Sequence, residues 1–198
     1  MKVLLLHAYP LDETMWEPQR EALAGHEVVA PNLYGLGGNT IDGWAEALLA
    51  EVEGPFAAVG ASMGGYVALA MARRQPERVA GLLLVGSRAG PDSPERRRYR
   101  DEQLRRLDDD GLIRATEALR DRPDASDVVR AYRGPFLLVA GADDELLPQE
   151  EAREIVASAP RGRLEVVEGA GHIVSQDRPD RFDEILREFL EWTSSSRS

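Results

Sequence analysis

The chain has 198 residues, 43% of them hydrophobic, a formal net charge of −11 at pH 7 and no cysteine. Its length favours a single domain, and the lack of cysteine excludes disulfides, thiolate nucleophiles and cysteine–zinc sites. This net charge repels phosphate backbones and anionic lipids, so we expect no nucleic acid as a partner. No apolar run approaches the ~20 residues of a membrane-spanning helix, so we expect no membrane partner and a cytoplasmic location.

Short apolar runs alternate with longer amphipathic stretches along the chain. The runs predict strands over residues 3–6, 27–30, 56–60, 79–85, 136–140 and 164–167. Apolar residues at helical spacing predict helices over 40–53, 63–75, 148–157 and 179–192. Six strands with helices between them imply an α/β fold with an open, mostly parallel sheet and right-handed crossovers.

One segment, residues 88–133, breaks this alternation and carries most of the charge runs. Its apolar residues recur at roughly helical spacing, which predicts a short helical cap over the top of the sheet. An arginine cluster within 96–106 lies among acidic residues, and we interpret it as a solvated, mixed-charge helix rather than a phosphate groove. The prediction is therefore one domain over 1–198, with 88–133 as a cap insertion.

The strongest chemical signal is the run GASMGG at residues 60–65, which follows an apolar strand and opens a helix. In that setting the pattern G-x-S-x-G predicts a sharp strand-to-helix turn that exposes the hydroxyl of Ser62 above the sheet edge. The same turn leaves the amide of Met63 free at a helix N-terminus, where it can stabilise an oxyanion. Ser62 is thus a candidate nucleophile.

A serine nucleophile needs a neighbouring base, and the chain has three histidines. His26 is typical of a surface turn, and no nearby acid or serine recommends His7 as the base. His172 follows the last predicted strand, at the same sheet edge as Ser62, and is the candidate base. Three scattered histidines do not make a metal site, so we expect neither a metal nor a cofactor.

The third member of such a site is a carboxylate that orients the imidazole. Three adjacent acids, Asp143, Asp144 and Glu145, follow the strand over 136–140. Spacing alone does not choose among them. The chain order of serine, acid and histidine matches the order found in one fold that carries the G-x-S-x-G turn.

Four motifs, spread over nearly the whole chain, resemble those of the α/β-hydrolase superfamily, close to small esterases, enol-lactonases and cofactor-free haloperoxidases. They are HAYP at 7–10 with MW at 15–16, NLYGLGGN at 32–39, GADDELLP at 141–148 and GAGH at 169–172. The resemblance implies the α/β-hydrolase fold, selects Asp144 as the acid, and assigns the oxyanion hole to the backbone amides of Tyr9 and Met63. It gives His7 a supporting role in the oxyanion loop.

The resulting hypothesis is a serine hydrolase that cleaves small to medium carboxylic esters through an acyl-enzyme, with Ser62, Asp144 and His172 as its triad. We expect Trp16 and Tyr34 to line the substrate pocket. The same triad also fits lactone or thioester hydrolysis, C–C cleavage or perhydrolysis. A hydroxynitrile lyase would need a cation near the nucleophile, and Lys2 is badly placed for that. A binding protein that keeps the fold without catalysis is the alternative from another class.

Overall fold

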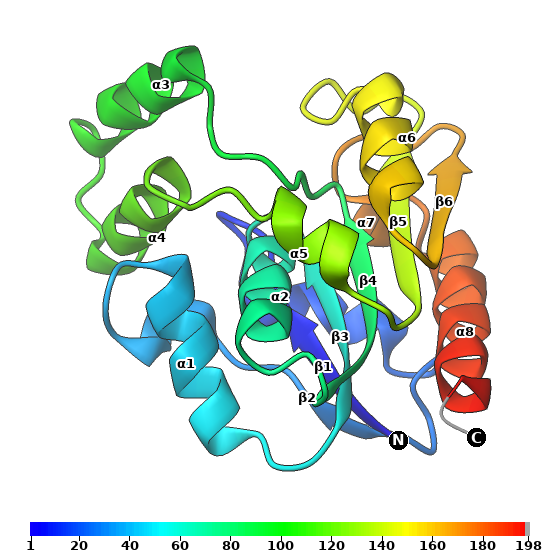
Figure 1. Ribbon diagram of the computed structural model, residues 1–198. Helices are drawn as coiled ribbons and strands as arrows, with labels where there is room; N and C mark the ends of the chain where they lie inside the picture. Colours follow the sequence, from blue (N-terminus) through cyan, green and yellow to red (C-terminus); the bar gives the residue numbers. More distant parts are fainter. Residues whose placement is uncertain (197–198) are drawn as a thin grey trace.

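Six parallel strands form the central sheet of the computed structural model, which describes residues 1–196 (Figure 1). Their order across the sheet is β2-β1-β3-β4-β5-β6, and every neighbouring pair is parallel. The strands are β1 (Lys2–Leu6), β2 (Glu27–Val29), β3 (Phe56–Ala61), β4 (Val79–Val85), β5 (Phe136–Gly141) and β6 (Gly162–Val167). The six predicted strands are confirmed, with ends displaced by at most two residues.

Helices cover both faces of the sheet, which explains why the central strands are apolar throughout. One face packs against α1 (Ile41–Glu51), α2 (Met63–Arg74), α5 (Ser126–Ala131) and α6 (Gln149–Ser158). The other face packs against the 3-10 helix η1 (Glu13–Gln19), α7 (Val174–Asp177) and α8 (Pro179–Ser195). Alternate residues of β3 enter the two cores, with Ala58 on the first face and Val59 on the second.

The segment between β4 and β5 holds α3 (Pro94–Leu104), α4 (Asp110–Arg120) and α5. α4 buries Leu119 and packs near the short 3-10 helix η2 (Leu33–Leu36), whereas α3 buries none of its residues. α5 contacts α2 and α6 and so belongs to the layer that flanks the sheet. The part of 88–133 that stands away from the sheet is therefore α3 with α4, at the upper left of Figure 1.

The predicted α/β architecture is confirmed, since the parallel sheet lies between two helical layers. The last two residues of the predicted domain, 197–198, lie outside the described residues. Within residues 1–196, no helix has both the length and the apolar character that crossing a membrane requires.

Candidate active site

The predicted site residues meet at the carboxyl edge of the sheet. Ser62 directly follows β3, Asp144 follows β5, and His172 lies in the loop between β6 and α7. The carboxyl ends of parallel strands share one edge, so three residues far apart in sequence come together there.

Ser62 has φ 47° and ψ −105°, the one positive φ among the non-glycine residues described. Such a conformation costs about 1–3 kcal/mol and persists only where the surroundings fix it. Here the Ser62 amide donates to the Val85 carbonyl at 2.7 Å, and the Ser62 carbonyl accepts from the Gly65 amide and the Ser87 hydroxyl, both at 3.1 Å. These bonds hold the strained turn of the predicted nucleophile.

Glycine at position 60 is required by how closely the chain passes itself in this turn. A Cβ on Gly60 would lie 2.5 Å from backbone atoms of Gly64 and Gly65. No real side chain tolerates that distance, so a larger residue would push the start of α2 away from β3. The sequence pattern G-x-S-x-G therefore has a steric cause here.

A continuous chain of hydrogen bonds joins the three predicted side chains. Ser62 Oγ lies 2.9 Å from His172 Nε2, and His172 Nδ1 lies 2.9 Å from one carboxylate oxygen of Asp144 and 3.1 Å from the other. With the imidazole proton on Nδ1, that nitrogen donates to the carboxylate, and Nε2 is free to accept from the serine hydroxyl. This arrangement can deliver a proton from Ser62 to His172.

The carboxylate of Asp144 is held from two sides. Its side chain is fully buried, and its Oδ1 also accepts from the amides of Leu146 at 2.8 Å and Leu147 at 3.1 Å. Burial raises its pKa, but the hydrogen bond and charge of His172 and the two amides outweigh it, so the net pKa of Asp144 is lowered. Asp144 is therefore ionised at neutral pH and fixed in orientation.

Tyr9 and Met63, whose backbone amides are predicted for the oxyanion hole, belong to elements next to this serine. Met63 is the first residue of α2, so its N–H has no intrahelical acceptor. Tyr9 follows β1, the strand next to β3, and its side chain lines the cavity that also contains Ser62. Among the hydrogen bonds within residues 1–196, none comes from the Tyr9 amide.

His7 ties this loop to the neighbouring one. It is fully buried; its Nδ1 lies 3.1 Å from the Ala8 carbonyl, and its Nε2 accepts from the Leu33 amide at 2.9 Å. Burial lowers the pKa of His7, which keeps the imidazole neutral. Because Nε2 accepts from the Leu33 amide, the proton of the neutral ring lies on Nδ1. His7 thus holds the loop that precedes Tyr9, and within residues 1–196 its hydrogen bonds go to Ala8 and Leu33 rather than to Ser62.

A cavity of about 590 Å³ opens over Ser62 and His172. Its floor is the sheet edge and its roof is α3, with Leu146 and Leu119 on its walls. The residues that line it are Tyr9, Ser62, Ser93, Glu95, Arg96, Tyr99, Arg100, Gln103, Leu119, Leu146 and His172. This volume is in the range of small-molecule sites.

The model of a known family, described as the alpha/beta hydrolase family, matches residues 3–185. The chain belongs to the alpha/beta hydrolase family. A thermophilic esterase from Thermogutta terrifontis, solved with malate bound, has 30% identity to this hydrolase and a TM-score of 0.87, covering 98% of this chain and 90% of that chain.

Several curated relatives are named pimeloyl-[acyl-carrier protein] methyl ester esterase. The protein from Neisseria meningitidis is 28% identical, over 96% of this hydrolase and 93% of the relative. The protein from Aromatoleum aromaticum is 40% identical over 91 residues, which span 43% of this hydrolase and only 36% of the relative. These likenesses and the family match identify an enzyme that acts as a hydrolase.

The two residues predicted for the substrate pocket do not line the cavity of the hydrolase. Trp16 is buried against Phe182, in the core on the α8 face of the sheet. Tyr34 packs edge-on against His7, and its hydroxyl donates to the Leu11 carbonyl at 2.7 Å. Both aromatic side chains support the layers beneath the site rather than the space above Ser62.

Sequence reasoning missed Gly86 and the arginines of the cap. Gly86 has φ +60°, and a Cβ there would lie 3.0 Å from the His172 ring and 2.5 Å from its carbonyl oxygen. A glycine directly after a strand was its only sequence signal. Arg96 and Arg100 line the cavity, four residues apart on α3. The sequence shows that spacing, but charged residues occur on all sides of the predicted helix. The sequence therefore does not indicate which face of the helix lines the site.

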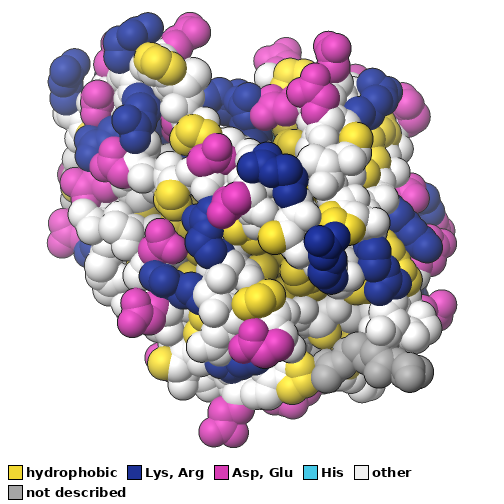
Figure 2. All heavy atoms as spheres, in the orientation of Figure 1, with side chains coloured by type: hydrophobic (Ala, Val, Ile, Leu, Met, Phe, Trp, Pro, Cys, Tyr) yellow, Lys and Arg dark blue, Asp and Glu magenta, His cyan; other side chains and the backbone are white. Residues whose placement is uncertain are grey.

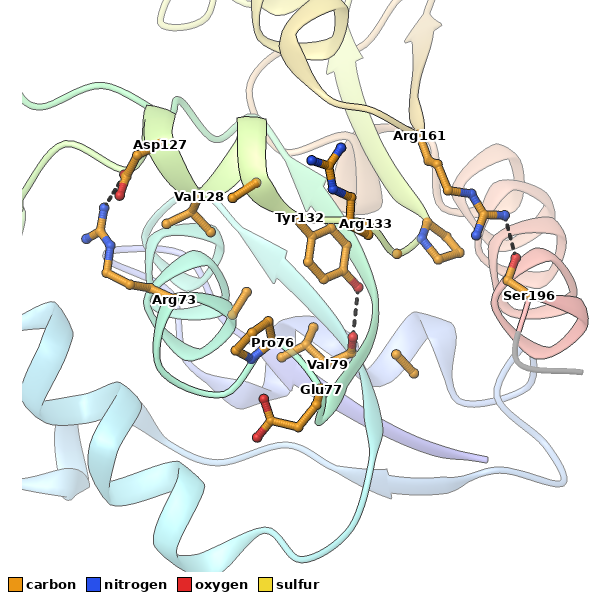
Figure 3. A pocket seen from close by; sticks show the side chains of 15 residues that line it. Arg73, Pro76, Glu77, Val79, Asp127, Val128, Tyr132, Arg133, Arg161 and Ser196 are labelled. Atoms are coloured by element: carbon orange, nitrogen blue, oxygen red, sulfur yellow. Dashed lines mark hydrogen bonds and ion pairs between the residues drawn. The ribbon is translucent and has the colours of Figure 1, made fainter.

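A second cavity, of about 640 Å³, lies at the opposite edge of the sheet (Figure 3). It is bounded by residues at the amino ends of β4 and β5 and by α5, including Val79 and Tyr132, whose hydroxyl donates to the Val79 carbonyl at 2.8 Å. None of the three histidines lines it. The histidine that contacts Ser62 lines the smaller cavity instead.

Proposed function

We propose that this hydrolase is a serine esterase that cleaves small to medium carboxylic esters through an acyl-enzyme on Ser62. The 2.9 Å contact between Ser62 Oγ and His172 Nε2 carries the proposal, because it joins a strained, accessible hydroxyl to a base. Three of the relatives support the ester reaction, since one is named an esterase and two are named methyl ester esterases. A cavity of about 590 Å³ suits acyl groups of modest size.

In the acylation step, His172 Nε2 accepts the hydroxyl proton as Ser62 Oγ bonds to the ester carbonyl carbon. Asp144 stabilises the imidazolium and keeps its proton on Nδ1. The tetrahedral intermediate collapses as its bond to the alcohol oxygen breaks, and His172 gives its proton to that oxygen. Water, deprotonated by the same imidazole, then attacks the carbonyl carbon of the acyl-enzyme. The bond from that carbon to Ser62 Oγ breaks, His172 returns its proton to Oγ, and the acid is released.

The developing negative charge requires donors in place before the reaction. The amides of Tyr9 and Met63 are proposed for this role, and the loss of one such donor typically costs about 3 kcal/mol of transition-state stabilisation. The free N–H of Met63 at the start of α2 supports the assignment. The bonds of His7 to Ala8 and Leu33 would hold Tyr9 in position.

The proposed domain organisation follows from the same cavity. We propose that the whole chain is one domain in which the insertion 88–133 supplies the cap through α3 and α4, because α3 forms the roof over Ser62. Lactone or thioester hydrolysis, C–C cleavage and perhydrolysis would use the same three side chains. A panel of p-nitrophenyl esters, lactones and acyl thioesters, compared by kcat/KM, separates these reactions.

A fluorophosphonate probe tests the nucleophile directly. The folded protein should gain the mass of one phosphonyl group, located at Ser62 by peptide mapping, and lose ester turnover in parallel. Ser62→Ala should abolish both labelling and turnover. Ser158→Ala is the matched control, because its hydroxyl donates to the Ile155 carbonyl on α6 and the residue does not line the cavity over Ser62. Turnover that survives in Ser62→Ala would contradict the proposal.

A further inference from the structure

The helix that roofs the cavity presents it with a polar face. Arg96, Tyr99, Arg100 and Gln103 all line the cavity, and their spacing of three and four residues puts them on one side of α3. A helix that covers a hydrophobic core has an apolar side that is buried against it. α3 has no buried residue, and the side that it turns to the cavity is mostly polar. Figure 2 shows the basic side chains gathered over α3, at the upper left.

Most of the cations around this roof already have an acidic partner. Arg88 makes two hydrogen bonds to Glu151, at 2.6 and 2.5 Å. Asp92 is shared, since Arg100 donates to its Oδ2 at 3.2 Å and Arg122 lies 2.6 Å from its Oδ1 as an ion pair without hydrogen-bond geometry. One buried carboxylate thus serves two guanidinium groups.

Arg96 differs from these neighbours. It donates one hydrogen bond, to the Leu146 carbonyl at 2.8 Å, and no carboxylate of residues 1–196 forms a salt bridge with it. Burial and the positive charge of Arg88 lower the pKa of Arg96, although Asp92 acts in the other direction. Arginine remains charged at neutral pH and has five N–H donors, so most of its donors lack a protein acceptor.

We propose that Arg96, with Arg100 beside it, binds a carboxylate carried by the ester substrate. The inference rests on the proposed function, because both arginines share their cavity with Ser62 and His172. A planar guanidinium matches a carboxylate with two parallel hydrogen bonds.

The local charge balance favours a monoanion. Counting Glu95 and Asp92 against Arg96, Arg100 and Arg122 leaves one net positive charge at the roof. One carboxylate neutralises that charge, whereas a phosphate dianion would exceed it. This positive site lies within a chain of net charge −11, whose overall field disfavours anions elsewhere.

The test compares matched esters that differ by one charge. Mono-p-nitrophenyl glutarate carries the carboxylate on the acyl side, and its methyl-capped form is the neutral reference. For the alcohol side, 4-carboxyphenyl butyrate is compared with its methyl ester. The measured quantity is the ratio of kcat/KM for the anionic ester to that for the neutral one, determined within each variant, so that partial unfolding cancels.

The wild type should prefer the anionic ester by about 10-fold or more in one of the two series, as a hydrogen bond to a charged group predicts. Arg96→Gln should remove most of that preference. Arg96→Lys should retain more of it than Gln, which a purely structural bond to Leu146 does not predict. Arg98→Gln is the matched control, because Arg98 is exposed on the same helix and does not line the cavity.

Equal ratios in the wild type and Arg96→Gln, in both series, would overturn the carboxylate site while neutral esters are still hydrolysed. Failure of the proposed function looks different, because Ser62→Ala would then keep its turnover of the neutral esters. The two failures are therefore distinguishable in one set of assays.

Discussion

Replacing Asp144 with asparagine tests how the carboxylate controls the imidazole. Oδ1 of Asp144 is held by the amides of Leu146 and Leu147, at 2.8 and 3.1 Å, so the asparagine oxygen must occupy that position. Its NH₂ group then faces His172 Nδ1, which lies 2.9 Å from the other oxygen in the wild type. Two donors cannot share that contact, so the imidazole proton moves to Nε2.

An imidazole protonated on Nε2 cannot accept the proton of Ser62, and such a tautomer change lowers kcat by about 10⁴-fold in a serine triad. The assay is kcat for p-nitrophenyl butyrate, together with the rate of fluorophosphonate labelling. Asp143→Asn is the matched control, because Asp143 lies next to Asp144 and makes no side-chain bond to His172. We expect it to keep wild-type kcat. If Asp144→Asn stayed within about 10-fold of the wild type with the same melting temperature, the reasoning would be refuted.

Two further predictions concern residues around this chain of bonds. Gly86→Ala should lower kcat by about 100-fold, because its Cβ would displace the His172 ring. Gly90→Ala is the control and should keep wild-type kcat, because no atom lies within 4 Å of a Cβ at that position. Equal kcat values for the two variants would contradict the steric argument. Since burial lowers the pKa of His7 in the folded state, the unfolded chain takes up its proton first, and the free energy of unfolding should fall as the pH drops below about 6.5. Urea unfolding between about pH 7.5 and about pH 5.5 measures this free energy. As the pH falls, it should decrease more steeply in the wild type than in His7→Gln, by at most about 1.4 kcal/mol per pH unit. The same pH dependence of the unfolding free energy in both proteins would rule this out.

The strands and their shared edge were predictable because burial leaves a direct trace in the sequence. β4 is apolar along its length, as a strand covered on both faces must be, and its predicted limits are those observed. The turn at Ser62 was predictable because close chain passage at Gly60 demands glycine. The contacts among Ser62, Asp144 and His172 agree with the expected geometry, while their catalytic role stays a prediction.

The pocket was not predictable, because it depends on which side chains face one another across distant elements. Trp16 follows a motif near the site, yet η1 turns its ring into the core beside Phe182. Arg96 belongs to a charged run whose surroundings are solvent on one side and the cavity on the other. Both the solvent side and the cavity side of α3 are polar, so the sequence does not show which side faces the cavity. Only the tertiary structure gives the orientation of this helix.

Because no side chain of α3 is buried, this helix contributes little to the hydrophobic free energy of the folded chain. Substitutions at its exposed positions, such as Arg98, should therefore cost the fold little, whereas Arg100 pairs with the buried Asp92. Substitutions at those exposed positions that line the cavity can change which substrates fit it without a compensating change in the hydrophobic core. The part of the cavity wall that α3 supplies is therefore separate from the hydrophobic core, which makes α3 the place to vary the cavity with the least cost to folding.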